Sequence, residues 1–239
     1  MSKLLILFIF ILPLYALEPN FGKYDGSAVI LDLNSSEKTV FGIRADERFS
    51  PCSTFKILNS MIALDSGVVK DENEVIKWDG VKREYEVWNR DHTMHSAIAV
   101  SAVWFYQELA SRIGEKRMRE YVSRAQYGNA DTSNTITDFW LGNGSLKISL
   151  NEQVDFLARL MRNNLEMPQH VMETAKDIIT LEKSDTYRLG GKTGSCGGAG
   201  WFVGFVQNRD KTTVFAFNIK GEGANGAKAK KIALEYLKR

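Results

Sequence analysis

Strand-like segments are confined to the two ends of this 239-residue chain, and helical periodicity fills the middle. Five segments suit strands and are bounded by polar or turn-forming residues: 27–33, 39–44, 187–192, 201–206 and 212–219. Because strands so far apart can share a sheet only if the chain leaves it and returns, the pattern predicts an α+β fold, an α/β sandwich. We expect one antiparallel sheet built from N- and C-terminal segments, flanked by helices, with an inserted all-helical lobe.

Helix signals divide the middle of the chain. Gly67 and Gly114 are typical helix stops, and Ser149 with Glu152 forms a capping box. The helices predicted from these signals and from the apolar periodicity cover about 55–66, 102–113, 150–163, 168–179 and 227–238. We therefore expect a single domain of residues 17–239, with a sheet lobe at 17–50 and 180–239 and a mainly helical lobe at 51–179.

Composition excludes several classes of protein. The chain is 44% hydrophobic and 25% charged, as in ordinary globular proteins. Its 31 basic and 29 acidic residues leave a net charge of +2. The sequence contains no basic stripe that would predict nucleic-acid binding. Two cysteines cannot form an all-cysteine zinc site, and the three histidines show no metal-binding spacing. We expect neither a metal nor a nucleic-acid partner.

The first residues resemble a secretory signal. Lys3 precedes an apolar run at 4–14, and Ala16 supplies a small residue at the expected cleavage point. The run is shorter than the roughly 20 residues that a membrane span needs. The alternative is a membrane-anchoring or buried helix. Pro13, near the end of the run, argues against it because proline disrupts a helix interior. The sequence predicts a signal peptide at 1–16 and a periplasmic mature protein with no stable membrane association.

Ser53 and Lys56 are the first candidates for chemistry. Three residues apart, they are neighbours on a helix surface, and Pro51 places Ser53 near a helix N-terminus. Lys56 follows Phe55, so we expect it to be buried, which lowers proton affinity and suits a neutral base. The alternative is a capping serine with a surface lysine, because Ser-x-x-Lys also occurs at 35–38 in a polar turn.

Lys192, Thr193 and Gly194 end a predicted strand. A cation and a hydroxyl beside a glycine suit an anionic, extended ligand, whereas the alternative is a hairpin turn with a solvated lysine. The backbone N–H groups of Ser53 and Ser195 are the candidate oxyanion hole.

Two further motifs lie at expected helix ends. Ser101-Ala102-Val103 opens a helix, where the Ser101 hydroxyl could relay a proton; an ordinary N-cap is the alternative. Tyr127-Gly128-Asn129 ends one, with a C-cap and polar turn as the alternative.

Ser-x-x-Lys followed by Lys-Thr-Gly is the mark of the penicillin-recognising serine enzymes. In finer detail the chain resembles the class D β-lactamases, or oxacillinases, over most of its mature length. A class A enzyme would have Ser-Asp-Asn in place of Ser101-Ala102-Val103. The stretches that carry the resemblance are 49–59, 62–67, Trp88 to Asp91, Ser101 to Val103, Tyr127 to Asn129, Lys192 to Gly194, and Trp201 with Gly204.

The resemblance implies the serine β-lactamase fold and hydrolysis of β-lactams, penicillins first, giving antibiotic resistance. It implies an acyl-enzyme on Ser53 and, as general base, Lys56 carboxylated by carbon dioxide or bicarbonate, with no other cofactor. Ser101 would pass a proton to the leaving nitrogen, Lys192 and Thr193 would meet the substrate carboxylate, and Gly194 would be a further substrate-binding residue. The remaining implied residues are Phe55, Val103 and Trp140 around the carbamate, and Tyr127, Gly128, Asn129, Trp201 and Gly204 as structural positions.

The chain departs from the family pattern in two places. Family members usually have an arginine after the last strand that binds the substrate carboxylate, and this chain has none before Arg239. Lys228 is the nearest candidate by position, and a solvated lysine is its alternative. Cys52 and Cys196 adjoin the two catalytic motifs, and a bridge there resembles that of class A carbapenemases. We predict a Cys52–Cys196 disulfide, with two reduced, packed thiols as the alternative.

Two other functions stay open. A β-lactam sensor domain would be acylated without turnover and would signal through a membrane helix, and the sequence offers no second apolar segment for one. A cell-wall DD-peptidase would acylate and stay blocked. The expected partner is a small-molecule β-lactam, and the expected state is a monomer or homodimer.

Overall fold

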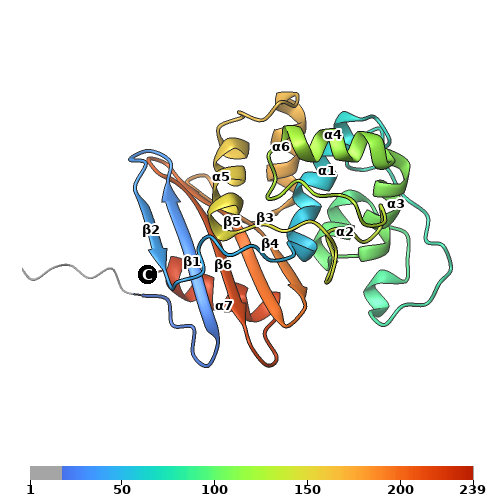
Figure 1. Ribbon diagram of the computed structural model, residues 1–239. Coiled ribbons are helices and arrows are strands. Elements are labelled where there is room, and N and C mark those ends of the chain that lie inside the picture. Colours follow the sequence, from blue (N-terminus) through green and yellow to red (C-terminus); the bar gives the residue numbers. More distant parts are fainter. Residues whose placement is uncertain (1–17, 239) are drawn as a thin grey trace, which may run out of the picture.

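The computed structural model describes residues 18–238, so the predicted signal peptide at 1–16 lies outside the described residues. Its single sheet has six antiparallel strands in the order β2-β1-β6-β5-β4-β3 (Figure 1). The strands are β1 (Asp25–Asp32), β2 (Lys38–Phe41), β3 (Thr180–Lys183), β4 (Tyr187–Cys196), β5 (Ala199–Asn208) and β6 (Thr212–Lys220). β1 pairs with β6 along its whole length, which joins the two ends of the chain. The predicted fold class is confirmed.

Helices occupy the segment between β2 and β3 and follow β6. They are α1 (Lys56–Asp65), α2 (Met94–Val100), α3 (Val103–Ile113), α4 (Glu115–Arg124), α5 (Leu150–Met161), α6 (Gln169–Ile178) and α7 (Gly226–Leu237). Two 3-10 helices, η1 (Cys52–Phe55) and η2 (Glu86–Trp88), complete the set among the described residues.

Both faces of the sheet are buried. Successive side chains of a strand point to opposite faces, and each face is covered by other elements. In β6, Val214 and Ala216 belong to the core shared with α5 and the helical lobe, whereas Phe215 and Phe217 pack with Ala229 of α7 on the opposite face. α5 therefore covers one face of the sheet and α7 the other (Figure 1). β4, which carries the Lys-Thr-Gly motif, lies against η1, so this motif and the Ser-x-x-Lys motif meet where the sheet and the helical lobe join.

No helix within residues 18–238 is long and apolar enough to cross a bilayer. The same residues contain no group of histidine, cysteine and acidic side chains suited to a metal ion.

Candidate active site

Ser53 and Lys56 lie on consecutive helical turns, Ser53 within η1 and Lys56 at the first position of α1. Lys56 Nζ is 3.0 Å from Ser53 Oγ. Lys56 is fully buried, while Ser53 remains partly exposed. Burial first, and the nearby charge of Lys192 second, hold the pKa of Lys56 well below its usual range. A neutral amine thus lies within hydrogen-bond reach of an accessible hydroxyl.

Ser101 connects the two lysines. It is the C-cap of α2, in the left-handed conformation with φ 57°, so the chain turns sharply before α3 begins. The Ser101 carbonyl accepts from Lys56 Nζ at 2.7 Å, and Ser101 Oγ lies 2.9 Å from the same nitrogen. Lys192 Nζ donates to Ser101 Oγ at 3.1 Å. The hydroxyl is therefore in contact with both amines.

Lys192 reaches this point from the middle of β4. Its side chain is only 4% exposed, and Nζ also donates to the carbonyl and hydroxyl oxygens of Thr193, at 3.0 and 3.3 Å. Burial, followed by repulsion from Lys230, lowers the pKa of Lys192 to about 7. Lys192 can therefore change charge near neutral pH.

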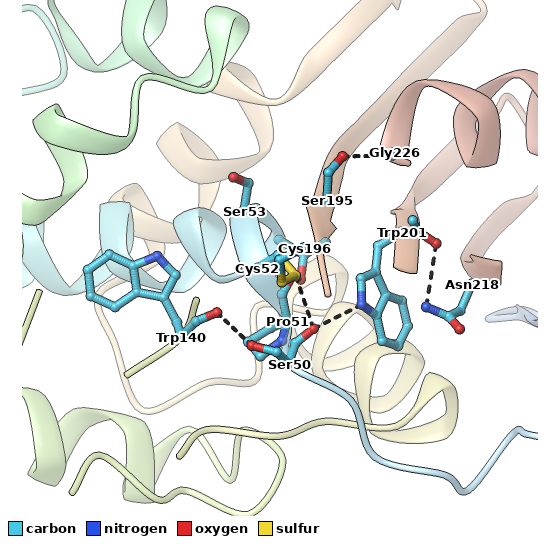
Figure 2. The surroundings of a disulfide bond; sticks show 12 residues. Ser50, Pro51, Cys52, Ser53, Trp140, Ser195, Cys196, Trp201, Asn218 and Gly226 are labelled. Atoms are coloured by element: carbon cyan, nitrogen blue, oxygen red, sulfur yellow. Dashed lines mark hydrogen bonds between the residues drawn. A yellow bond between two sulfur atoms is a disulfide. The ribbon is translucent and has the colours of Figure 1, made fainter. Parts of the chain in front are cut away.

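An aromatic cluster surrounds Phe55, the residue before Lys56. Phe55 stacks on Trp140 with ring centroids 5.5 Å apart and meets Phe139 and Tyr127 edge to face. Trp140 is fully buried, and its Nε1 has no hydrogen-bond partner among the described residues. Figure 2 shows this nitrogen on the edge of the indole that faces Ser53. Val103, at the start of α3, is half-buried. A buried N–H donor is thus left for a group that the side chains do not provide.

Cys52 and Cys196 form a disulfide that ties η1 to the end of β4 (Figure 2). Their Cα atoms are 6.0 Å apart. Gly194 lies in the same contact, where an added Cβ would be 2.8 Å from the carbonyl oxygen of Pro51. A side chain at this position would push β4 away from the nucleophile. The bond therefore joins the residue before Ser53 to the residue after Ser195.

The chain and its fold match known proteins in three comparisons. Residues 26–238 match the family model described as the penicillin binding protein transpeptidase domain. The probable beta-lactamase YbxI of Bacillus subtilis (strain 168) is 42% identical over 226 residues, which cover 93% of this chain and 83% of that protein. A crystal structure of a class D beta-lactamase from Bacillus subtilis superimposes with a TM-score of 0.89 at 42% identity, covering 93% of this chain and 94% of that one. The chain belongs to the class D β-lactamase family.

One relative of this class D chain is a regulator. Regulatory protein BlaR1 of Bacillus licheniformis is 39% identical over 226 residues, which cover 91% of this chain but 37% of BlaR1. The solved C-terminal domain of this penicillin receptor has a TM-score of 0.84 at 38% identity, with 90% of each chain covered. The class D fold is therefore common to named enzymes and a named receptor.

The residues implied by the class D resemblance as structural positions contact the backbone around the site. Trp201 Nε1 donates to the carbonyl oxygen of Ser50 at 3.0 Å, next to the disulfide (Figure 2). Gly128, at φ 58°, lies so close to the backbone that an added Cβ would overlap the carbonyl oxygen of Lys147. Gly204 lies equally close to Gly190 in β4, and Asn129 binds Ser145 at the exposed end of this turn. These residues support the site without joining the Ser53 cluster.

Lys228 lies apart from the Ser53 cluster of this class D chain. Its Nζ donates to the carbonyl oxygen of Gly223 at 2.7 Å and lies 5.6 Å from the centroid of the Tyr24 ring. These contacts engage the ammonium group in the loop between β6 and α7. A role in binding a carboxylate stays a prediction.

A buried polar group adjoins Thr54, the residue after Ser53, and was not predicted from the sequence. Gln153 of α5 donates to Thr54 Oγ1 at 2.8 Å, and the Tyr127 hydroxyl lies 3.5 Å from the same oxygen. All three side chains are fully or nearly fully buried. A glutamine on the apolar face of a predicted helix was the available signal, because a buried amide needs partners.

Proposed function

We propose that this protein hydrolyses β-lactams through an acyl-enzyme on Ser53. The observation that carries the proposal is the buried Lys56 amine, 3.0 Å from Ser53 Oγ and with a lowered pKa. A serine hydroxyl needs an adjacent base to become a nucleophile at neutral pH. Family membership supports the choice of substrate.

Acylation follows from the positions of these groups. Ser53 Oγ attacks the carbonyl carbon of the lactam while its proton leaves toward Lys56. The ring C–N bond breaks, and Ser101 Oγ, within 3.1 Å of Lys192 Nζ, delivers a proton to the departing nitrogen. The backbone N–H groups of Ser53 and Ser195 are proposed to bind the carbonyl oxygen as it gains charge. Lys192 and Thr193 bind the substrate carboxylate.

Lys56 is proposed to carry a carbamate on Nζ. Only a neutral amine combines with carbon dioxide, and burial favours that form of Lys56. An unpartnered donor supports such a group, since Trp140, whose Nε1 is without a partner among the described residues, stacks on Phe55 next to Lys56 in the chain. A carbamate would supply a stronger base than the serine hydroxyls offer, for acylation and for hydrolysis of the ester. Phe55 and Val103 exclude bulk water from its apolar side.

The proposed setting is the periplasm, where this activity would confer resistance. The signal-like residues 1–16 and the disulfide support this location, because disulfides persist in oxidising compartments.

A receptor domain that is acylated without turnover is the second candidate. The likeness to BlaR1 and to its solved C-terminal domain favours it. The two functions share the first chemical step and differ in deacylation.

A time course by mass spectrometry separates them. The mature chain is mixed with excess benzylpenicillin in bicarbonate buffer, and both the adduct and the product are followed. We expect an adduct on Ser53 that disappears while penicilloate accumulates. An adduct that persists for hours would instead establish the receptor, and the absence of both adduct and product would overturn both candidates.

A further inference from the structure

We propose that Gln153 of α5 is a positioning residue for Ser53 and acts through the hydroxyl of Thr54. The inference rests on the proposed function, because the step that it serves is the acylation of Ser53. Within the part of the chain that the structure describes, the Gln153 amide binds Thr54 and Tyr127. Any effect of Gln153 on the reaction therefore passes through these neighbours.

Ser53 lies in a short segment that has little stability of its own. η1 has four residues, and its N-cap residue, Pro51, makes no side-chain hydrogen bond to it. A 3-10 helix of this length also has poorer hydrogen-bond geometry than an α-helix. The direction of the Ser53 side chain therefore depends on what holds the residues beside it. The disulfide holds Cys52 on one side, and Thr54 is buried on the other.

The Thr54 hydroxyl has a fixed proton direction. Thr54 Oγ1 donates to the carbonyl oxygen of Pro51 at 2.8 Å. Because a hydroxyl carries one proton, the same oxygen accepts from Gln153 Nε2, which lies 2.8 Å away. Thr54 and Gln153 are at most 1% exposed, so bulk water does not compete for these hydrogen bonds.

The other end of the Gln153 amide binds Tyr127. The Tyr127 hydroxyl donates to Gln153 Oε1 at 3.4 Å. Burial raises the pKa of Tyr127, so this hydroxyl keeps its proton. The hydrogen bonds therefore run in one direction, from Tyr127 through Gln153 and Thr54 to the carbonyl of Pro51. A side chain at position 153 must accept at one atom and donate at another, which an amide does and an ionised carboxylate does not.

The Pro51 carbonyl, where these hydrogen bonds end, lies at the contact between η1 and β4. The Cβ that Gly194 lacks would be 2.8 Å from this oxygen. Ser53 comes two residues after Pro51, and Ser195 comes directly after Gly194. The two backbone N–H groups proposed to bind the lactam oxygen therefore lie on either side of this contact. Movement of the Pro51 carbonyl would change their spacing, and a misplacement of about 1 Å can lower a rate by 10²-fold.

α5 holds Gln153 in a fixed place. The capping box of Ser149 and Glu152 closes the N-terminus of this helix just before Gln153. The helix packs against β1 and β6 of the sheet. Gln153 thereby connects the sheet to the segment that carries the nucleophile, and this connection keeps Ser53 Oγ 3.0 Å from Lys56 Nζ.

The competing role for Gln153 is structural, in which it only satisfies buried hydrogen bonds. Pre-steady-state kinetics separate the two roles. Acylation of the mature chain by benzylpenicillin is followed by rapid quench and intact-protein mass spectrometry over a range of substrate concentrations. The saturation curve gives the apparent affinity and the acylation rate constant separately, and urea unfolding gives the stability of each variant.

The variants test the donor, the acceptor and their connection. Gln153→Met removes the amide, and Gln153→Glu keeps its shape but has no donor when ionised. Thr54→Val removes the hydroxyl, Thr54→Ser keeps it, and the double variant Gln153→Met/Thr54→Val removes both partners. Gln107→Met is the matched control, because Gln107 of α3 also donates to a backbone carbonyl, that of Thr137, at 3.1 Å.

We expect Gln153→Met, Gln153→Glu and Thr54→Val each to lower the acylation rate constant by about 10- to 100-fold, since the reacting groups are displaced. The apparent affinity should change little, because none of these side chains touches the substrate. The double variant should be no slower than the slower single variant, since both single changes break the same hydrogen bonds. Thr54→Ser and Gln107→Met should acylate at nearly the wild-type rate.

An acylation rate constant in Gln153→Met equal to that of Gln107→Met would overturn the inference, whatever the loss of stability. Losses that multiply in the double variant would do the same, because Gln153 would then act independently of Thr54. If Gln153→Met does not fold, Gln153→Glu takes its place in both comparisons. Acylation without turnover in wild type would reject the proposed hydrolysis while leaving these comparisons intact. Failure of wild type to acylate would overturn both.

Discussion

Lys56 and Lys192 approach the same oxygen from different lobes, with their amines 2.9 Å and 3.1 Å from Ser101 Oγ. Two buried cations this close repel each other, so the arrangement favours loss of a proton from one of them. Burial first, and the charge of Lys192 second, hold the pKa of Lys56 well below its usual range. Lys192, with a pKa of about 7, keeps its charge below that pH and loses it above. One amine is thus suited to be a base and the other to attract an anion.

Replacing Lys56 by methionine should lower kcat for benzylpenicillin by about 10²–10⁴-fold, the usual contribution of a positioned base. The variant should also accumulate an acyl adduct on Ser53 if deacylation depends on the same group. Steady-state hydrolysis and intact-protein mass spectrometry measure these effects. Lys176→Met is a matched control, because Lys176 is also buried but binds Asn163 and Glu173 and none of the site residues. A Lys56→Met enzyme as active as this control would contradict the proposed base.

The activity on anionic substrates should decline as pH rises through about 7, where Lys192 loses its proton. We expect kcat/KM for benzylpenicillin to fall on the alkaline side, and a profile from pH 5.5 to 9 measures this. In Lys192→Arg the decline should be absent, because a guanidinium stays charged over this range. A decline of the same form in the arginine variant would assign the titration to another group.

Lys192 should also make folding stability pH-dependent. Its folded pKa of about 7 lies below the ordinary value of 10.5, so between these pH values the unfolded chain binds more protons than the folded one. The free energy of unfolding should therefore rise as pH increases from about 7 to 10. Urea unfolding at several pH values tests this, and Lys192→Met should reduce the slope. An unchanged slope in that variant would show that Lys192 does not titrate in this window.

Trp140→Phe keeps the aromatic ring and removes the N–H group. Because Trp140 Nε1 has no partner among the described residues, no hydrogen bond is lost, but the smaller ring leaves a cavity in the core that should lower the free energy of unfolding by about 1–3 kcal/mol. The occupancy of the Lys56 carbamate should fall, and deacylation should slow by about tenfold or more. Carbon-13 NMR with labelled bicarbonate reports the carbamate directly, and excess bicarbonate should partly restore turnover. Full carbamate occupancy in the variant would exclude Trp140 as its partner.

The Cys52–Cys196 bond should contribute about 2–5 kcal/mol to the free energy of unfolding, as is typical of native disulfides. Urea unfolding of wild type and of the Cys52→Ala/Cys196→Ala double variant measures the difference. Thiol titration of the denatured, unreduced wild type should find no free thiol. Two free groups would mean that the bond does not form.

The elements best predicted from sequence have local signals. The capping box of Ser149 and Glu152 opens α5 where expected, and the strand before the Lys-Thr-Gly motif starts at Tyr187 in both the prediction and the structure. That strand was predicted to end at Lys192, but it continues to Cys196, because pairing with β5 extends it past Gly194, a residue of low strand propensity.

Other features depend on the tertiary fold. β3 was not expected, since Thr180–Lys183 is mostly exposed and polar and is a strand only through its pairing with β4. The left-handed turn at Ser101 was not predicted, because no glycine marks this position in the sequence. The residues of Ser-x-x-Lys are neighbours by helix geometry alone, whereas the 3.1 Å contact of Lys192 with Ser101 requires the two lobes to be assembled.

The separation of 144 residues between Cys52 and Cys196 also bears on how the protein matures. During synthesis Ser53 and Lys56 are made early, but β4, which carries the partner cysteine, comes much later. The bond can form only when the late strand has reached η1 and an oxidant is present. The surroundings of the nucleophile are therefore completed late in biogenesis, and in the proposed periplasmic setting the covalently closed site should arise after export and not on the ribosome.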